Sequence, residues 1–252
     1  MTAAKARSAL APAGWARGSH TADGATHDTY RKGSGPGVIV IHEMPGITPS
    51  VVTFADEVVE HGYTVVMPHL FGRVGASATP TALARSMGQV CVSREFIKLA
   101  SGVTSPVAGW LRSLAHSLHG ELGGPGVGAL GMCLTGGFAL AMMVEDSVVA
   151  PVLAQPSLPF AIGAGRGADL GLSPADHEAM RRRVAAGCPV LGVRYREDKA
   201  TGTRFETLTR ELGDGFIRVE FEGKGHSTLT EHRQQVAVDR VLAFFDERLT
   251  PA

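Results

Sequence analysis

Short, continuous apolar runs alternate along this chain with longer segments in which apolar residues recur every three or four positions. Brief runs rich in β-branched residues are typical of strands buried on both faces of a parallel sheet. The longer segments have the period of amphipathic helices. The predicted strands are residues 37–42, 64–67, 148–153, 189–195 and 216–222, together with the run that begins at Gly128.

Three of the predicted helices begin at a hydroxyl residue followed by proline, at Thr48-Pro49, Ser105-Pro106 and Ser173-Pro174. The hydroxyl can accept a hydrogen bond from a free amide of the first turn, and proline suits the first helical position. The first of these helices runs to about Gly62, and a glycine pair at 123–124 ends the second. Further helices are predicted at 94–99, at 203–212, at 231–249 and directly after Cys133.

Strand and helix alternate from residue 37 to the last helix, which predicts one α/β domain over residues 1–252. The sheet is expected to be mostly parallel and doubly wound, with helices on both faces. Residues 1–35 are polar and rich in glycine. They suggest a loosely ordered N-terminal arm over about residues 1–30 and one or two short edge strands.

Composition narrows the function classes. Apolar residues make up 44% and charged residues 19% of the chain, which favours a sizeable core. Lysine plus arginine number 24 and aspartate plus glutamate also 24, so the basic excess of a nucleic-acid-binding protein is absent. The one dense basic run, residues 181–183, follows Glu178 with helical spacing and is interpreted as a solvated helix face.

No apolar stretch is long enough for a membrane span, and the first twenty residues lack the apolar core of a signal peptide. The cysteines Cys91, Cys133 and Cys188 form no CxxC motif, and their odd number indicates free thiols in a reducing compartment. We therefore expect a cytoplasmic protein that acts on a small molecule, without nucleic-acid or membrane partners. The sequence gives no indication of its oligomeric state.

Reactive side chains follow four of the predicted strands: Glu43, Cys133, Asp198 and His226. Because ligands bind at the carboxyl ends of strands in open α/β sheets, these side chains are expected to meet. A nucleophile, an acid and a histidine in that order is the arrangement of α/β-hydrolases. The thiol attacks a carbonyl, the imidazole accepts and returns its proton, and the carboxylate fixes the imidazole tautomer.

The surroundings of Cys133 favour its role as nucleophile. An apolar run enters the segment, a helix-forming run leaves it, and Gly131, Gly136 and Gly137 surround the thiol. This is typical of a nucleophile elbow, a strained strand-to-helix turn that tolerates only small neighbours. The other cysteines, Cys91 and Cys188, are expected to be buried and inert. Asp198 could instead be a turn residue, with Glu197 as the alternative acid, and Glu43 could simply cap the helix that follows it.

These motifs together resemble the dienelactone hydrolase family, a branch of the α/β-hydrolase fold with a cysteine nucleophile. The resemblance extends over residues 38–70, 128–140 and 189–245. It depends on residues 42–46 (HEMPG), 67–71 (MPHLF), 131–134 (GMCL), 197–198 (ED) and 225–227 (GHS).

The resemblance implies a triad of Cys133, Asp198 and His226. It further implies an oxyanion hole formed by the backbone N–H groups of Leu134 and Met44. Glu43 corresponds to the acidic residue that the family places beside the thiol, where it influences the protonation of the sulfur.

The chain departs from the family pattern at two places. Thr135 stands where the family usually has glycine, so different packing is expected behind the elbow. Family members that cleave dienelactone carry an arginine shortly after the histidine, whereas this chain has none between His226 and Arg233. Arg85 and Arg94 are the candidates to hold a substrate carboxylate instead.

Two motifs that suggest a metal or a cofactor fail on closer inspection. His42-Glu43 begins like the zinc motif HExxH, but Gly46 stands where the second histidine is needed. The glycines at 126, 128 and 131 satisfy GxGxxG but lie before and within the strand, whereas a dinucleotide fingerprint follows its strand. Neither a cofactor nor a metal is expected.

The leading hypothesis is thus a cofactor-independent hydrolase that cleaves a small-molecule ester, lactone or thioester through an acyl-enzyme. One alternative is a non-catalytic α/β-hydrolase-fold protein that binds a small ligand. The other is an acyl or peptide hydrolase of the same fold.

Overall fold

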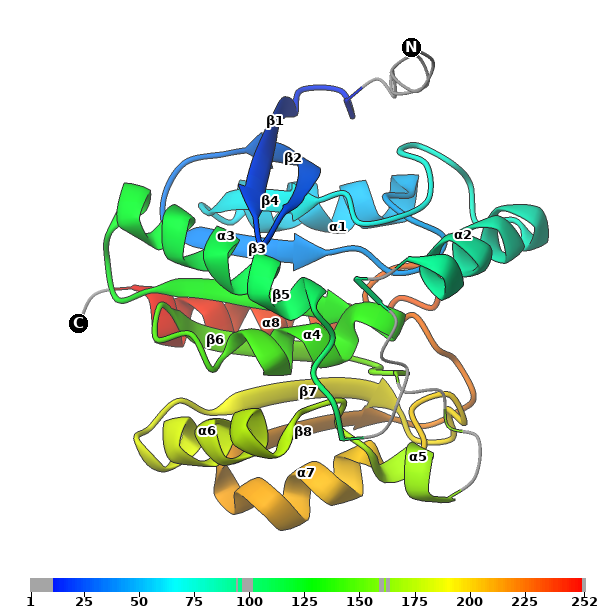
Figure 1. The fold of residues 1–252 in the computed structure, drawn as a ribbon, viewed down its shortest axis with the longest axis vertical. Helices are drawn as coiled ribbons and strands as arrows, with labels where there is room; N and C mark the ends of the chain where they lie inside the picture. The colour runs from blue at the N-terminus through cyan, green and yellow to red at the C-terminus, as the bar shows by residue number, and fades with distance from the viewer. Residues whose placement is uncertain (1–10, 94, 97–101, 159–160, 162–163, 251–252) are drawn as a thin grey trace.

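The computed structural model describes residues 11–93, 95–96, 102–158, 161 and 164–250. Eight strands form one sheet in the order β1-β2-β4-β3-β5-β6-β7-β8 (Figure 1). The pairs β1/β2 and β2/β4 are antiparallel and all other neighbours are parallel. The strands are β1 (Ala16–Ala22), β2 (Ala25–Lys32), β3 (Gly37–Ile41), β4 (Thr64–Pro68), β5 (Val127–Met132), β6 (Val148–Ala154), β7 (Val190–Tyr195) and β8 (Phe216–Phe221).

Helices connect the parallel strands, as right-handed crossovers in such sheets require. The α-helices are α1 (Pro49–Glu60), α2 (Pro80–Val92), α3 (Val107–Leu122), α4 (Gly136–Met142), α5 (Ala164–Ala168), α6 (Pro174–Ala185), α7 (Arg204–Leu212) and α8 (Gln235–Leu249). Two short 3-10 turns are η1 (Cys133–Thr135) and η2 (Gly213–Gly215). None of the helices in the described ranges has the length and apolar character that crossing a bilayer requires.

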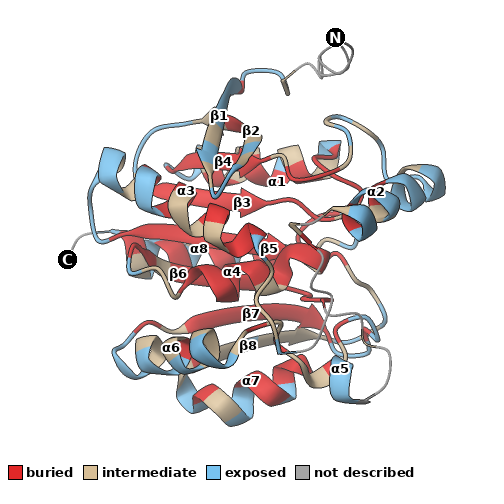
Figure 2. Cartoon of the chain, in the orientation of Figure 1, coloured by how far each residue is buried: buried red, intermediate tan, exposed pale blue. Residues whose placement is uncertain are grey.

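The sheet separates two apolar cores, and β3 contributes to both because its side chains alternate between the faces. Ile39 and Ile41 pack in the core that includes α3, α4, α6 and α7. Val38 and Val40 pack in the core that includes α1 and α8. The central strands are buried almost throughout (Figure 2), which explains why they appear in the sequence as continuous apolar runs.

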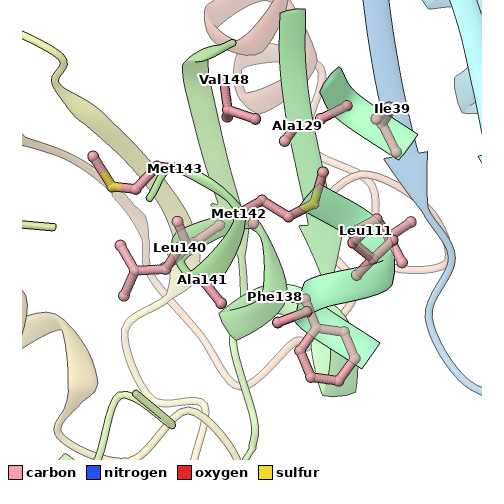
Figure 3. Packing of buried hydrophobic residues seen from close by; sticks show 14 of the residues in the cluster. Ile39, Leu111, Ala129, Phe138, Leu140, Ala141, Met142, Met143 and Val148 are labelled. Carbon is pink, nitrogen blue, oxygen red and sulfur yellow. The ribbon is translucent and has the colours of Figure 1, made fainter. Parts of the chain in front are cut away.

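Helix α4 is the most buried of the helices that flank the sheet near Cys133. Phe138, Leu140 and Met142 all belong to the first core, where they pack with residues of the sheet and of α3. Figure 3 shows these side chains around α4, beside Leu111 and Ile39. Close packing of this kind leaves little freedom for rotamer change, so α4 is a rigid base for the turn that precedes it.

Most of the predicted elements are confirmed. Thr48 and Ser173 cap their helices by accepting hydrogen bonds from amides of the first turn, at 3.3 and 3.2 Å. Ser105 does not cap: α3 begins at Val107, and its N-cap residue makes no side-chain hydrogen bond. Pro80 follows another capping residue, Thr79, so the same arrangement of hydroxyl residue and proline starts α2.

Several boundaries differ from the predicted ones. The edge strands expected within residues 1–35 are confirmed as β1 and β2, an antiparallel pair that joins the sheet beside β4, so the expected loose arm does not extend to residue 30. Helix α5 lies in the glycine- and proline-rich stretch 156–172, where no helix is predicted, and α8 begins four residues later than predicted. The helix predicted at 94–99 falls largely outside the described residues.

Candidate active site

The turn after β5 has the strained geometry expected of a nucleophile elbow. Cys133 has a φ of +55°, a conformation that side chains other than glycine rarely adopt. A Cβ on Gly131 would lie 2.2 Å from the carbonyl oxygen of Thr135, and one on Gly136 would lie 2.7 Å from the Cα of Pro156. The elbow therefore requires glycine at both positions, because backbone atoms occupy the space of any side chain.

The structure brings Cys133, Asp198 and His226 together at the carboxyl ends of β5, β7 and β8. His226 Nδ1 lies 2.7 Å from Asp198 Oδ2, and Cys133 is among the groups that act on the pKa of His226. Asp198 is buried, whereas Glu197, the alternative acid, is exposed. The geometry thus selects Asp198 over its neighbour as the partner of the histidine.

Hydrogen bonds hold the Asp198 carboxylate in place. Its Oδ2 also accepts a bond from the Thr201 hydroxyl at 2.8 Å, and its Oδ1 accepts one from the Ala200 amide at 3.0 Å. Burial favours the neutral carboxyl, but the bonds from His226 and Thr201 outweigh it and lower the pKa of Asp198. The residue is therefore an anion when it receives the imidazole N–H.

The charged form of His226 is stabilised by its two neighbours. Burial alone would lower the pKa of His226, but hydrogen bonds and charge interactions with Asp198 and Cys133 raise it to about 10. An opposite charge at short range favours the protonated imidazole. The site therefore favours a protonated imidazole on His226.

Ser157 is a second polar neighbour of the thiol that the sequence pattern did not reveal. Its hydroxyl oxygen lies 3.4 Å from Cys133 Sγ, and its amide donates to the Cys133 carbonyl at 3.0 Å. It follows β6 by three residues, in a segment where proline and glycine obscure any periodic signal. A search of all strand ends for hydroxyl groups would have found it.

Glu43 lies at the site, where its carboxylate bonds, within the described residues, to the loop that carries His226 and not to the thiol. Its carboxylate accepts hydrogen bonds from Ser227 at 2.8 Å, from Thr230, and from the Gln155 amide at 3.4 Å. Among the bonds that the described side chains form, none joins Glu43 to the Cys133 thiol. Burial raises the pKa of Glu43, although the bonds from Thr230 and Ser227 oppose the shift.

Further contacts fix the loop that carries His226. The Tyr195 ring packs so closely on Gly225 that a Cβ there would lie 2.4 Å from it, and the Tyr195 hydroxyl donates to the His232 carbonyl at 2.6 Å. On the other side, Gln155 accepts bonds from the amide and hydroxyl of Thr228. Tyr195 and Gln155 are thus supporting residues that motif matching did not identify.

The two expected oxyanion donors lie on segments that leave neighbouring strands. Ile41 pairs with Gly131 in the sheet, so Met44 follows β3 close to where Leu134 follows β5. Side chains of both Met44 and Cys133 pack against the same apolar core. Leu134 lies in η1, the turn that leads into α4, and the first amides of a helix have no partner within it.

The arginine candidates occupy different places. Arg85 is exposed on α2, and Arg94 lies outside the described residues. Arg233, the first arginine after His226, forms an ion pair with Glu57 at 2.6 Å. Thr230, four residues after His226, uses its hydroxyl on Glu43.

His42 is a structural residue at the edge of the site. It is fully buried, with Nδ1 3.0 Å from the Glu43 carbonyl and Nε2 accepting from the Leu70 amide at 3.1 Å. Burial lowers the pKa of His42 to about 3, so it is neutral and uses both ring nitrogens within the protein. In the described part of the chain, no cluster of three His, Cys, Asp or Glu side chains could hold a metal ion.

The other two cysteines differ from each other. Cys188 is buried as expected, and burial raises the pKa of its thiol despite nearby arginines. The prediction that Cys91 is buried is wrong: Cys91 is exposed, because α2 buries only Ser86 and Val90.

Comparison with known proteins identifies the family and the fold of the chain. A sequence model described as "Dienelactone hydrolase family" matches residues 24–243. No curated protein matches the chain significantly. A dienelactone hydrolase from Anabaena variabilis has a similar structure, with a TM-score of 0.65 and 15% identity over 94% of this chain and 98% of that one. A cold-adapted esterase from an Arctic intertidal metagenomic library gives a TM-score of 0.62 and 16% identity over 93% of each chain.

Proposed function

The chain belongs to the dienelactone hydrolase family and is a hydrolase of ester bonds, and we propose that it cleaves a small-molecule lactone, ester or thioester with Cys133 as its nucleophile. His226 is the proton carrier and Asp198 its orienting acid. The reaction proceeds through an acyl-enzyme and requires no cofactor. The 2.7 Å contact between His226 and Asp198, beside a thiol at a strained elbow, carries the proposal.

In the first half of the reaction the Cys133 sulfur attacks the substrate carbonyl carbon, and the thiol proton resides on His226. The carbonyl oxygen becomes negative in the tetrahedral intermediate, where the N–H groups of Leu134 and Met44 stabilise it. One such donor contributes about 3–4 kcal/mol to transition-state stabilisation. The carbon–oxygen or carbon–sulfur bond then breaks, and His226 gives its proton to the leaving group.

The second half consumes one water molecule. His226 takes a proton from water, and the resulting hydroxide attacks the thioester formed with Cys133. Collapse of this intermediate breaks the carbon–sulfur bond, releases the carboxylic acid and returns the proton to the thiol. Asp198 stabilises the imidazolium in both halves through its short hydrogen bond, which keeps Nε2 directed at the reacting groups.

The residues around Glu43 favour substrates other than dienelactone. Where dienelactone-cleaving relatives carry an arginine after the histidine, this chain has residues 227–230 without one, and the hydroxyl of Thr230 bonds to Glu43. A substrate carboxylate therefore meets no arginine in residues 227–230. Uncharged esters, lactones and thioesters fit this feature better than an anionic lactone.

The test is hydrolysis of p-nitrophenyl acetate, a lactone and an acyl thioester by the wild-type chain and by Cys133→Ala. We expect the substitution to lower kcat at least about a thousandfold, because it removes the atom that forms the acyl-enzyme. Cys188→Ser is the matched control and should retain activity. Undiminished turnover by Cys133→Ala would refute the proposal.

Iodoacetamide labelling provides a second readout of the same proposal. It must be carried out in a Cys91→Ser background, since Cys91 is exposed and reacts on its own. We expect Cys133 to be alkylated rapidly and buried Cys188 only slowly. Esterase activity should be lost at the same rate as Cys133 is alkylated.

A further inference from the structure

Thr135 joins the ends of the two strands from which the active-site segments depart. It is fully buried, and its hydroxyl oxygen accepts a hydrogen bond from the Met132 amide at 3.0 Å. The hydroxyl proton faces the carbonyl oxygens of Ile41, His42 and Met132 at 3.2, 3.1 and 3.0 Å. One side chain thus bonds to the last residues of both β3 and β5.

The sheet itself does not join the two segments beyond this point. Pairing of β3 with β5 ends where Ile41 lies opposite Gly131. After it, one segment continues through Glu43 to Met44 and the other through Cys133 to Leu134. Thr135 is therefore a direct hydrogen-bonded link between the backbone on either side of this gap.

We propose that Thr135 is a positioning residue that fixes the distance between the oxyanion donors, the N–H groups of Met44 and Leu134. The inference rests on the function proposed above. Both donors must lie about 2.7–3.1 Å from the developing oxyanion, so a small change in their separation weakens catalysis. A glycine at this position has no hydroxyl and would not form this link.

The role differs from one in general stability because it acts on the transition state. The carbonyl oxygen carries full negative charge only in the tetrahedral intermediate, so misplaced donors lower kcat and leave KM nearly unchanged. Alkylation of the thiol by iodoacetamide displaces iodide at a saturated carbon and forms no oxyanion. Its rate is therefore expected to be independent of Thr135.

The experiment compares Thr135→Val, which keeps the shape and removes the hydroxyl, with Thr135→Ser, which keeps the hydroxyl. We expect kcat for p-nitrophenyl acetate to fall about 10- to 100-fold in Thr135→Val, since a misplacement of about 1 Å can cost a factor of about a hundred. KM should stay within about twofold, and Thr135→Ser should recover most of kcat. The affinity for a trifluoromethyl ketone, which forms an oxyanion on the enzyme, should fall by the same factor as kcat.

All variants carry Cys91→Ser, and circular dichroism verifies that each variant is folded before rates are compared. Thr135→Ala serves as a second hydroxyl-free variant in case Thr135→Val yields no folded protein. Equal kcat in wild type and Thr135→Val, or a parallel loss of alkylation rate and kcat, would overturn the inference. If Cys133→Ala remains active, the proposed function itself fails. If Cys133→Ala is inactive but the Thr135 variants keep wild-type kcat, this inference alone fails.

Discussion

Replacing Asp198 with asparagine tests whether the carboxylate prepares His226 to take the proton of the Cys133 thiol, because it changes only the atom that faces the imidazole. In the wild-type chain Oδ1 accepts from the Ala200 amide, while Oδ2 accepts from both Thr201 and His226. Asparagine keeps the shape, but the Ala200 amide selects its oxygen for the Oδ1 position. The amide NH₂ then faces His226 Nδ1, where the carboxylate was 2.7 Å away.

This exchange imposes the wrong tautomer on the imidazole. A donor opposite Nδ1 makes that nitrogen an acceptor and moves the remaining proton to Nε2, which then cannot take a proton from Cys133. The same substitution in serine-protease triads lowers kcat about ten-thousandfold. Because each factor of ten corresponds to about 1.4 kcal/mol, a loss of about 4–5.5 kcal/mol, or 10³- to 10⁴-fold, is expected here.

The assay measures kcat and KM for p-nitrophenyl acetate with wild type, Asp198→Asn and Glu197→Gln. Glu197 is the adjacent exposed acid, so its amide variant controls for loss of one negative charge and should remain within about twofold of wild type. Circular dichroism verifies that the variants are folded. If Asp198→Asn retains more than a tenth of wild-type kcat, Asp198 does not orient His226 in the manner argued.

Two further predictions concern stability. Gly131→Ala should lower the free energy of unfolding by about 1–3 kcal/mol or more in urea denaturation, because its Cβ would lie 2.2 Å from a backbone oxygen. Gly137→Ala is the control and should not lower it, because the nearest atom to its Cβ would lie 3.6 Å away. Equal stabilities of the two variants would contradict the steric argument. The interaction of His226 with Asp198 should also make stability depend on pH. Because the pKa of His226 is raised to about 10, its contribution to stability is full below about pH 6.5 and is lost as the pH rises through about 10. Because the pKa of Asp198 is lowered, its contribution is present above about pH 4. The difference in unfolding free energy between wild type and Asp198→Asn should therefore be largest from about pH 4 to 6.5 and should decline by pH 10, and a difference that stays constant with pH would refute the coupling.

The sequence was sufficient to predict the central strands and the reactive residues that follow them. Both depend on local signals: apolar runs for strands such as β3, and small residues around Cys133 for the elbow. Assignment of roles to Leu134 and Met44 required the family resemblance, because almost every residue has a backbone N–H and residue type does not reveal which of them binds an oxyanion.

Other features depend on contacts between distant segments and could not be predicted. From the sequence, Thr135 is only a departure from the family pattern, because its hydroxyl bonds to carbonyl groups more than ninety residues away. Gln155 and Ser157 act through the same kind of long-range contact. Cys91 was misjudged because a residue type's average burial does not indicate how loosely its own helix packs.

The carboxylate of Glu43 has a consequence for the order of assembly during folding. Its bonds to Ser227 and Thr230 span 184 and 187 positions of the chain. Contacts between such distant positions form late, because a large loop must close before they contribute. A ribosome-bound chain can therefore pair β3 with β4 long before synthesis reaches His226. We expect the sheet to form first and hydrolytic competence to arise only when the last tenth of the chain has emerged.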